Sequence, residues 1–390
     1  MSTSTSAATT TPAVAKPASR RLISLDVFRG LAVAGMILVD NPGTDDLAYG
    51  PIKHTVWNGW TPADFIFPSF MFLVGASMVL SFQARLQRGE TRGQILRHAV
   101  QRTLILIALG IFINGFPVFH LANWRIEGVL QRIAVCYLIA AALVLGSDWR
   151  GQFVVLAACL LGYWALMRFL PVPGFGVPGR DIPFMDQDRN LVAWVDRSLF
   201  PGRLYDGTRD PEGLISNIPA VGTTLLGVLT GHWLLSGREK ATIVFRMVLI
   251  GGLGVVAGLV WNLSFPINKH LWTSSFVLFS GGLSLVTLAL LYWVVEIKQW
   301  RGVWTMPILV FGMNAVAGFV ADALVWGPGY SFTAKGPKGA DISWHEVANA
   351  RLGALGMNAA NTSVLYSLGA VLFCWVVLWM LWRKRIFLKV

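Results

Sequence analysis

Long apolar runs dominate the chain, and short polar segments separate them. A run of about 18 or more predominantly apolar residues is long enough to cross a bilayer as a helix. Helix is the structure expected of each run, because a backbone in lipid must satisfy its own hydrogen bonds. The runs cover residues 22–40, 63–83, 99–116, 129–147, 152–170, 214–235, 243–263, 272–295, 304–326 and 361–382. The pattern predicts an all-α, polytopic transmembrane helical bundle of about ten spans.

Composition agrees with this interpretation. The chain has 390 residues, of which 55% are hydrophobic and 13% charged, whereas a soluble domain carries about 25% charged residues. The deficit extends along the whole chain, which excludes a soluble protein with one anchor. The net charge of +12 could indicate nucleic-acid binding, but the basic residues gather in alternate loops, as the positive-inside rule describes. We expect a lipid bilayer as the surroundings and no nucleic acid as a partner.

The basic loops also predict the orientation. They contain Arg85, Arg88, Arg92, Arg97, Arg102, Arg238, Lys240, Arg246, Lys298, Arg301, Arg383, Lys384, Arg385 and Lys389. With an even number of spans, both termini are predicted to be cytoplasmic, and the loops 41–62, 171–213 and 327–360 to face outward. Residues 1–20, rich in Ser, Thr, Ala and Pro, are predicted to be a disordered cytoplasmic tail. Residues 21–390 are predicted to form a single transmembrane domain.

The stretch "KHTVWNGWTPADFIFP" leads into the second span and contains the strongest candidate for chemistry. Thr61 and Asp64 have the spacing of a helix cap, with Pro62 at the first helical position. His54 precedes this cap at the expected boundary between water and membrane. A helix N-terminus nearby favours the neutral imidazole, which can act as a general base. A catalytic and a purely structural interpretation of this stretch both stay open, since Trp57 and the cap residues could serve the fold alone.

The first span carries charged residues at both ends. Asp40 and Asn41 lie at its outer end, where either could orient His54 or bind an oxyanion, or simply mark the end of the helix. Asp26 and Arg29 form an i,i+3 pair at its cytoplasmic end. Such a pair is either a structural ion pair or part of a polar pathway, since ionisable groups inside a span usually mark one.

Other polar residues gather mostly toward the outer ends of spans and suggest a polar cavity that opens outward. They are Asn114, Arg125, Glu127, Gln131, Arg132, Asn262, Asn268, Lys269, Trp272, Asn314 and Asp322. The three cysteines fall inside spans and the histidines lack metal-ligand spacing, so neither a disulfide framework nor a metal is predicted. The glycine-rich runs "GGLGVVAGL" and "GGLSLVTL" predict close helix packing.

Six segments together resemble the heparan-α-glucosaminide N-acetyltransferase family, in particular its shorter bacterial branch. They are "RLISLDVFRG", "ILVDNPG", "KHTVWNGWTPADFIFPSFMFLVG", "RIEGVLQRIAVCY", "DPEGLISNIPA" and "NKHLWTSSFVL". The resemblance extends from about residue 20 to the end. It implies a transmembrane acetyltransferase that moves an acetyl group from cytosolic acetyl-CoA to the amine of a glucosamine unit across the membrane. Lysosomal members carry a lumenal domain before the helices, which is missing here. We therefore expect a small amino sugar as acceptor, a bacterial inner membrane as location and a homodimer.

The resemblance also implies roles for residues. It makes His54 the catalytic residue, and either Asp40 or Asn41 its partner from the preceding helix. The expected sugar-binding residues are Trp57, Asn58, Trp60, Asp64, Asn268, Lys269 and Trp272. Those expected at the CoA nucleotide are Arg29, Arg132, Arg238, Lys240 and Arg246, because guanidinium and ammonium groups bind phosphates, together with Asp26, which pairs with Arg29.

Two mechanisms and two other functions stay open. His54 could act as a base in a ternary complex, or be acetylated first. We favour the ternary complex, because no adjacent group is predicted to activate His54 as a nucleophile. An O-acyltransferase of the acyltransferase-3 type, which opens with a similar Asp-x-x-Arg-Gly helix, would instead acylate a sugar hydroxyl. An amino-sugar transporter is less favoured, because two corresponding broken helices are not evident.

Overall fold

The computed structural model describes residues 21–43, 48–120, 124–200, 202–335 and 341–388. The predicted tail 1–20 lies outside this part of the chain. The helices are α1 (Ile23–Asp40), α2 (Ile66–Gln87), α3 (Arg92–Gly115), α4 (Val129–Gly146), α5 (Trp149–Phe169), α6 (Leu191–Leu199), α7 (Asn217–Leu235), α8 (Lys240–Trp261), α9 (Ser274–Tyr292), α10 (Thr305–Met313), α11 (Ala315–Ser331), α12 (Trp344–Gly353) and α13 (Ala359–Arg383). The strands β1 (Thr333–Lys335) and β2 (Asp341–Ser343) form an antiparallel hairpin.

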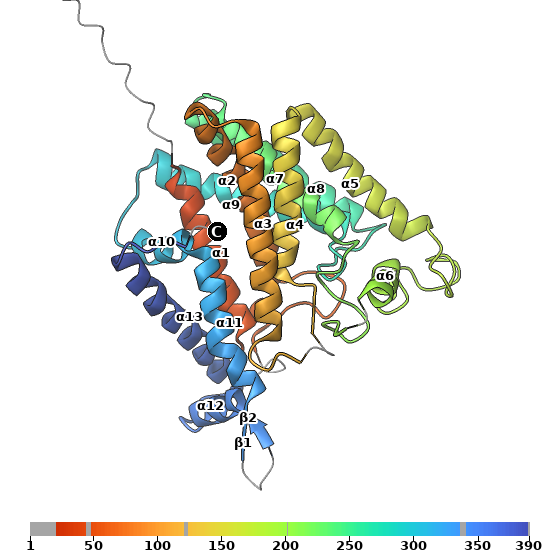
Figure 1. Ribbon diagram of the computed structural model, residues 1–390, viewed down its shortest axis with the longest axis vertical. Helices are drawn as coiled ribbons and strands as arrows, with labels where there is room; N and C mark the ends of the chain where they lie inside the picture. The colour runs from red at the N-terminus through yellow and green to blue at the C-terminus, as the bar shows by residue number, and fades with distance from the viewer. Residues whose placement is uncertain (1–20, 44–47, 121–123, 201, 336–340, 389–390) are drawn as a thin grey trace, which may run out of the picture.

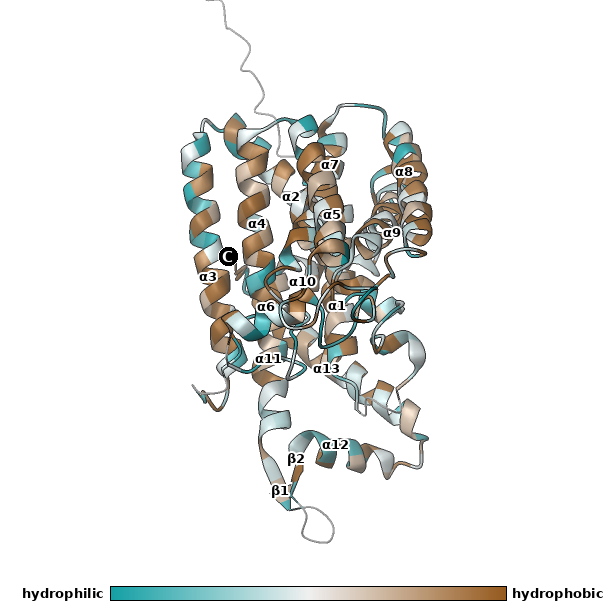
Figure 2. Cartoon of the chain, turned by 90° about the vertical axis from the view of Figure 1, so that its right-hand side faces the viewer, coloured by the Kyte–Doolittle hydropathy of each residue, from teal (hydrophilic) through white to brown (hydrophobic). Residues whose placement is uncertain are grey.

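The all-α class is confirmed, and each predicted run folds as helix. Within the described residues, eight helices are long and apolar enough to cross a membrane, or nine if α10 and α11 count as one span. The first run forms α1, which is 18 residues long but carries Asp26, Arg29 and Asp40 and so falls short of that apolar standard. Figure 2 shows apolar residues along the long helices, while β1, β2 and α12 project beyond the bundle.

One predicted span is not continuous. The run 304–326 divides into α10 and α11, which meet at an angle of 82°. Asn314 lies at the break, and its side chain bonds with the C-terminal segment rather than with its own helix. Its amide donates to the carbonyl of Ile386 at 3.1 Å and accepts from the backbone N–H of Leu388 at 3.1 Å. At the bend between α10 and α11, Asn314 therefore holds the segment that contains Ile386 and Leu388.

Helices α2, α7 and α9 form the centre of the bundle, whereas α8 and α13 expose most of their residues. Small residues let the central backbones touch. A Cβ on Gly227 of α7 would lie 1.9 Å from the Phe72 carbonyl oxygen of α2. The predicted close packing of the two glycine-rich runs is also confirmed, since a Cβ on Gly282 would lie 2.5 Å from the Gly251 carbonyl oxygen.

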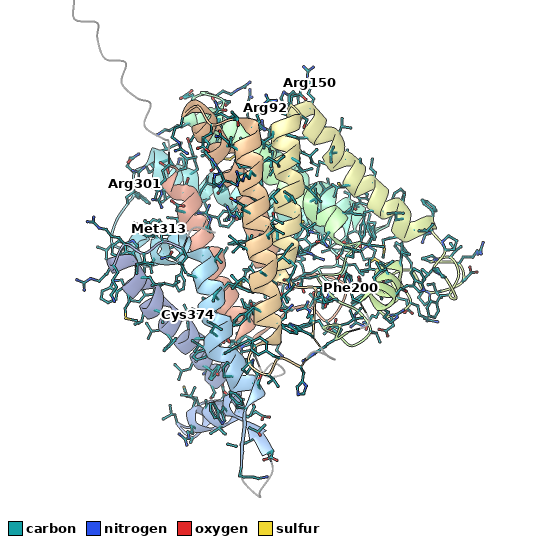
Figure 3. The ribbon with its side chains drawn as sticks, viewed as in Figure 1. Arg92, Arg150, Phe200, Arg301, Met313 and Cys374 are labelled. Atoms are coloured by element: carbon teal, nitrogen blue, oxygen red, sulfur yellow. The ribbon has the colours of Figure 1, made fainter. Side chains whose placement is uncertain are left out.

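The two ends of α1 define the two ends of the bundle (Figure 1). We call the end at which α1 begins, near Arg21, the basic end. Arg92 and Arg150 lie toward this end in Figure 3. Phe387 lines the same cavity as Arg21, so the described chain begins and finishes close together. We call the opposite end, where α1 reaches Asp40 and α2 is about to begin, the His54 end.

The predicted orientation can be tested with two exposed valines. Val56 is 87% exposed at the His54 end and Val303 is 91% exposed in the loop before α10. In a variant without the native cysteines, Val56→Cys should react with an impermeant thiol reagent from the outside. Val303→Cys, the matched control, should react only once the cytoplasmic face is opened. Labelling of Val56→Cys from the cytoplasmic side alone would reverse the orientation.

Candidate active site

His54 lies between two carboxylates. It belongs to the segment that joins a short helical turn, Gly50–Ile52, to the turn Pro62–Phe65 at the start of α2. Its Nδ1 is 2.8 Å from Oδ1 of Asp64, and its Nε2 is 3.9 Å from Oδ1 of Asp40. The imidazole is partly exposed, whereas the Asp64 side chain is buried. One ring nitrogen is thus held by a buried acid, and the other faces an accessible one.

Asp64 reaches His54 because it also caps the helix. Its Oδ2 accepts from the backbone N–H of Thr61 at 3.0 Å, in the predicted capping box. The same oxygen accepts from the N–H of Thr55 at 3.1 Å and from its hydroxyl at 3.0 Å. These bonds leave Oδ1 directed at His54. A carboxylate oxygen in such a cap only accepts, so we assign the imidazole hydrogen to Nδ1 and the lone pair to Nε2.

This contact changes one expectation. The sequence did not predict a group adjacent to His54, whereas the structure places Asp64 in hydrogen-bond contact with its ring. Ten residues separate the two in sequence, and no helical or strand period brings residues at that spacing together. Only the turn at Thr61 and Pro62 folds the segment back on itself.

Lys269 completes the surroundings of the imidazole. Its Nζ lies 3.0 Å from Nδ1 and 3.4 Å from Nε2 of His54, and 3.4 Å from Oδ1 of Asp64. Burial alone would lower the pKa of His54, and Lys269 lowers it too. The carboxylates of Asp40 and Asp64 outweigh both, so the pKa of His54 is raised above its ordinary value. The neutral, proton-accepting form is therefore reached at a higher pH than for a free histidine.

Asp40 and Asn41, which the sequence left as alternatives, point in different directions. The side chain of Asp40 is 43% exposed and is the one that faces His54. Asn41 is 1% exposed. Its amide donates to the Ile37 carbonyl at 2.9 Å and to Oδ1 of Asp322 on α11 at 2.7 Å. The structure brings Asp40, and not Asn41, to the imidazole.

The residues expected to bind the sugar divide into packed and accessible ones. The Trp57 indole donates to the Met185 carbonyl at 3.0 Å, and the guanidinium of Arg209 lies 5.0 Å from its ring centre. Trp272 is buried, with Arg132 4.9 Å from its ring centre. Both rings are therefore packed by arginines.

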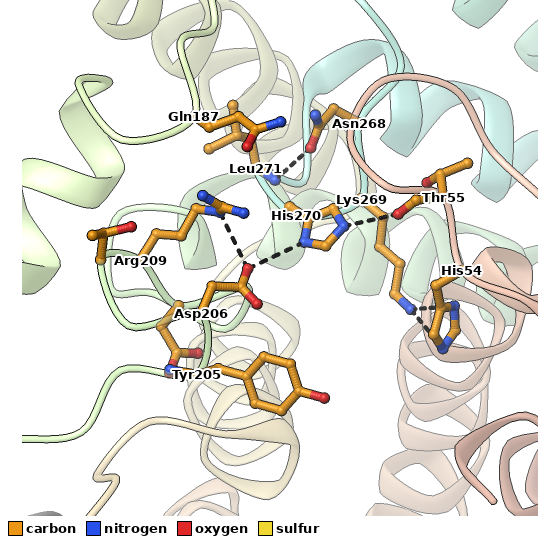
Figure 4. A network of polar contacts seen from close by, with 12 residues as sticks. His54, Thr55, Gln187, Tyr205, Asp206, Arg209, Asn268, Lys269, His270 and Leu271 are labelled. Carbon is orange, nitrogen blue, oxygen red and sulfur yellow. Dashed lines mark hydrogen bonds and ion pairs between the residues drawn. The ribbon is translucent and has the colours of Figure 1, made fainter. Parts of the chain in front are cut away.

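Asn58 and Asn268 form an amide pair at 3.1 Å. Trp60 stays exposed, although its ring centre lies 4.8 Å from that of Phe279. Figure 4 shows the segment 268–271 between the His54 loop and the loop of Asp206 and Arg209. There, His270 Nε2 lies 3.1 Å from the Thr55 carbonyl, and its Nδ1 lies 3.8 Å from Asp206.

A cavity of about 580 Å³ opens at the basic end. Two of the expected CoA-binding residues, Asp26 and Arg29, line it. Sequence reasoning did not assign its other polar lining residues, which are Arg21, Ser77, Ser81 and Arg88. Arg21 belongs to the same "RRLISLD" block as Asp26, a signal that could have indicated it. Ser77 and Arg88 come from α2 and its end, and only the packing of α2 against α1 places them here.

Inside this cavity Asp26 binds two arginines, Arg29 at 2.8 Å and Arg21 at 2.7 Å. The remaining expected CoA-binding residues do not line it. Arg238 and Arg246 are exposed near the start of α8, and the Lys240 ammonium donates to the Glu296 carbonyl at 2.9 Å. Arg132 is buried near the His54 end, where it bonds to the Ser216 hydroxyl and the Gly213 carbonyl.

The molecule is thus a multi-spanning helical protein with a histidine–carboxylate site at one end and a basic cavity at the other. A family model described as "Heparan-alpha-glucosaminide N-acetyltransferase, catalytic" matches residues 21–258. The human heparan-alpha-glucosaminide N-acetyltransferase is 31% identical over 355 residues, which cover 77% of this chain and 52% of the human protein. The mouse protein is 30% identical over 369 residues, 80% of this chain and 55% of its own. The chain belongs to the heparan-α-glucosaminide N-acetyltransferase family, and it spans about half the length of these curated relatives.

The raised pKa of His54 gives a direct test of the Asp64 contact. Diethyl pyrocarbonate modifies neutral imidazole, so the extent of modification follows the loss of the proton as pH rises. In the wild-type protein the midpoint should lie above the ordinary histidine value of about 6.5. Asp64→Asn removes a carboxylate that raises the pKa, so its midpoint should move to lower pH, as read by peptide mass spectrometry.

Glu346→Gln is the matched control for that experiment. Glu346 accepts from the backbone N–H of Ser343 in the capping box of α12, far along the chain from His54. The substitution removes the same charge from the same kind of cap and should leave the His54 midpoint in place. An unshifted midpoint in Asp64→Asn would contradict the contact.

Proposed function

We propose that the protein transfers the acetyl group of acetyl-CoA to the amine of a glucosamine-type sugar at His54. The observation that carries the proposal is the arrangement along α1, in a chain of this family. An imidazole whose Nε2 faces the accessible carboxylate of Asp40 stands at one end of that helix, and an arginine-lined cavity opens at the other. The acceptor amine is delivered at the His54 end, and the CoA nucleotide is held at the basic end.

The amine of glucosamine is largely protonated at neutral pH and must lose a proton before it can attack. The exposed carboxylate of Asp40 attracts the ammonium group and holds it next to Nε2 of His54. One proton passes to solvent. As the nitrogen bonds to the thioester carbonyl, Nε2 takes a second proton, and Asp64 stabilises the imidazolium that forms. The carbon–sulfur bond then breaks, and that proton passes to the CoA sulfur, which regenerates neutral His54.

Lys269 offers a positive charge where the reaction needs one. Attack on the thioester places negative charge on the carbonyl oxygen, and fixed cations or N–H donors at that point lower the barrier. The Lys269 ammonium lies within 3.4 Å of both His54 Nε2 and Asp64 Oδ1. We therefore assign to Lys269 the stabilisation of the tetrahedral intermediate, rather than contact with the sugar ring alone.

Acetyl-CoA has to reach along α1 to bring both ends together. Fourteen positions separate Asp26 from Asp40, a rise of about 21 Å in an α-helix. Arg21, Arg29 and Arg88 bind the nucleotide phosphates. Asp26 competes with those phosphates for Arg21 and Arg29, with which it forms ion pairs. The pantetheine arm then runs beside α1 toward His54. On this route the acetyl group crosses the membrane alongside α1.

Direct transfer is the mechanism we favour, now for a different reason. Asp64 orients His54, so Nε2 could also attack the thioester itself. Asp40, however, holds a cationic amine on the same side of the ring as Nε2. An anionic anchor also suits an amine better than a hydroxyl, which favours N-acetylation over O-acylation. Glucosamine should release CoA from acetyl-CoA, whereas the N-acetylated sugar should not.

Loss of the imidazole should abolish most of the activity. We expect His54→Ala to lower kcat for CoA release by roughly 10²–10⁴-fold, the usual scale for a general base. Acetyl-CoA should still bind, because the nucleotide site lies at the other end of α1. His98→Ala, an exposed histidine near the start of α3, is the control and should keep the wild-type rate. Wild-type activity in His54→Ala would rule out this role.

The cavity at the basic end should govern the KM for acetyl-CoA. Arg88 lines it with a side chain 63% exposed, so its replacement should not unfold the protein. We expect Arg88→Gln, and more strongly Arg29→Gln, to raise the KM for acetyl-CoA while that for glucosamine stays the same. Arg246→Gln removes an exposed arginine outside the cavity and should change neither. An acetyl-CoA KM that moves only in Arg246→Gln would place the nucleotide along α8 instead.

A further inference from the structure

Tyr205 stands out among the aromatic side chains of the outer loops. It lies between α6 and α7, and it is 63% exposed. One face of its ring is covered by Arg125, whose guanidinium carbon lies 4.8 Å from the ring centre. A large exposed ring on a monomer surface is ordinary by itself. A ring with one face backed by a fixed cation and much of its surface open has the form of a stacking platform.

The support beneath Tyr205 is rigid. Asp210, which is buried, accepts from Nε of Arg125 at 2.6 Å and from its Nη2 at 2.5 Å. Glu212 accepts from the same guanidinium. Asp210 Oδ2 also accepts from the backbone N–H of Tyr205 at 3.2 Å. A single buried carboxylate therefore fixes both the backbone of Tyr205 and the cation under its ring. A ligand that stacks there meets a surface that needs little ordering on binding.

The platform lies beside the catalytic groups. Asp206, which follows Tyr205 in the chain, lies 3.8 Å from His270, and His270 bonds at 3.1 Å to the carbonyl of Thr55, the residue after His54. Asp40 lies 3.9 Å from Nε2 of His54. In Figure 4 the Tyr205 ring extends from its loop toward the side on which His54 lies. The next residue, Asp206, directs its carboxylate at His270 and Arg209. Tyr205 and its neighbour thus place an aromatic face and a polar group on the side of the site where the His54 loop lies.

A pyranose ring matches these groups. It has a face of C–H groups that packs on an aromatic ring and an edge of hydroxyls that bond to polar side chains. The sequence led us to expect Trp57 and Trp60 in this role. Trp57 has the Arg209 guanidinium 5.0 Å and the His270 ring 5.5 Å from its ring centre, and its indole is bonded to Met185, whereas Trp60 lies 4.8 Å from the Phe279 ring. We infer that Tyr205 is the platform on which the acceptor sugar stacks, with its amine directed to Asp40 and His54. This inference rests on the proposed acetylation of an amino sugar.

Two substitutions at Tyr205 distinguish the contribution of its ring from that of its hydroxyl. Tyr205→Ala removes the stacking face, and we expect the KM and the Kd for glucosamine to rise about tenfold, the equivalent of about 1.4 kcal/mol. Tyr205→Phe keeps the ring and should stay within about twofold of the wild type, on the same basis. The Kd is measured by calorimetry without acetyl-CoA. The KM for acetyl-CoA should not change in either variant, which also shows that both are folded.

Two further variants make the result specific. Phe175→Ala removes another exposed aromatic ring from the outer loops and should leave glucosamine binding unchanged. If Trp60→Ala weakens glucosamine binding and Tyr205→Ala does not, Trp60 is the platform and the inference is overturned. If the wild-type protein acetylates glucosamine and Tyr205→Ala has the same KM and Kd for it, the role of Tyr205 is refuted and the proposed function is not. A wild-type protein that releases no CoA with any amino sugar in a panel refutes the proposed function instead.

Discussion

The buried carboxylate of Asp64 has two roles in this protein, one in the fold and one at His54. Oδ2 of Asp64 closes the capping box at the start of the second span and accepts two bonds from Thr55. Oδ1 holds Nδ1 of His54. A helix cap contributes about 1 kcal/mol, and a hydrogen bond to a charged group about 1.5–3 kcal/mol. The two together explain why an imidazole in a loop has one orientation. The fold and the proposed chemistry share this residue, since one carboxylate both caps the helix and bonds to the imidazole.

The rest of the site follows from where α1 ends. Because α1 terminates at Asp40, its last carboxylate stands beside the imidazole, while the amide of Asn41 turns inward to Asp322. The first turn of the same helix carries Asp26 between Arg21 and Arg29 in the basic cavity. Charged groups in a membrane helix are costly unless they are paired or face a polar space. Here they stand at the two places where the proposed reaction needs a polar acceptor and an anionic donor.

The helical architecture could be predicted from sequence because hydropathy is a local property of each run. The 82° break at Asn314 could not, since the bonding partners of Asn314 lie about 70 positions later, at 386 and 388. Partners distant in sequence also decide the surroundings of the tryptophans. "WNGW" is typical of interface or sugar-binding aromatics, but Arg209, about 150 positions away, packs on Trp57. Similarly, Arg132 is buried against Trp272 instead of facing phosphates. Residues whose partners are near in sequence, such as Thr61 and Asp64 or Asp26 and Arg29, were placed correctly.

The central claim is that donor and acceptor meet from opposite sides of the membrane along α1. Proteoliposomes of uniform orientation test it most directly, with acetyl-CoA sealed on the side of the basic cavity and glucosamine supplied on the side of His54. The account predicts that N-acetylglucosamine forms in the glucosamine compartment and CoA stays in the other. With both substrates confined to the His54 side, no product should form. Equal product formation with both substrates on that side would contradict the account.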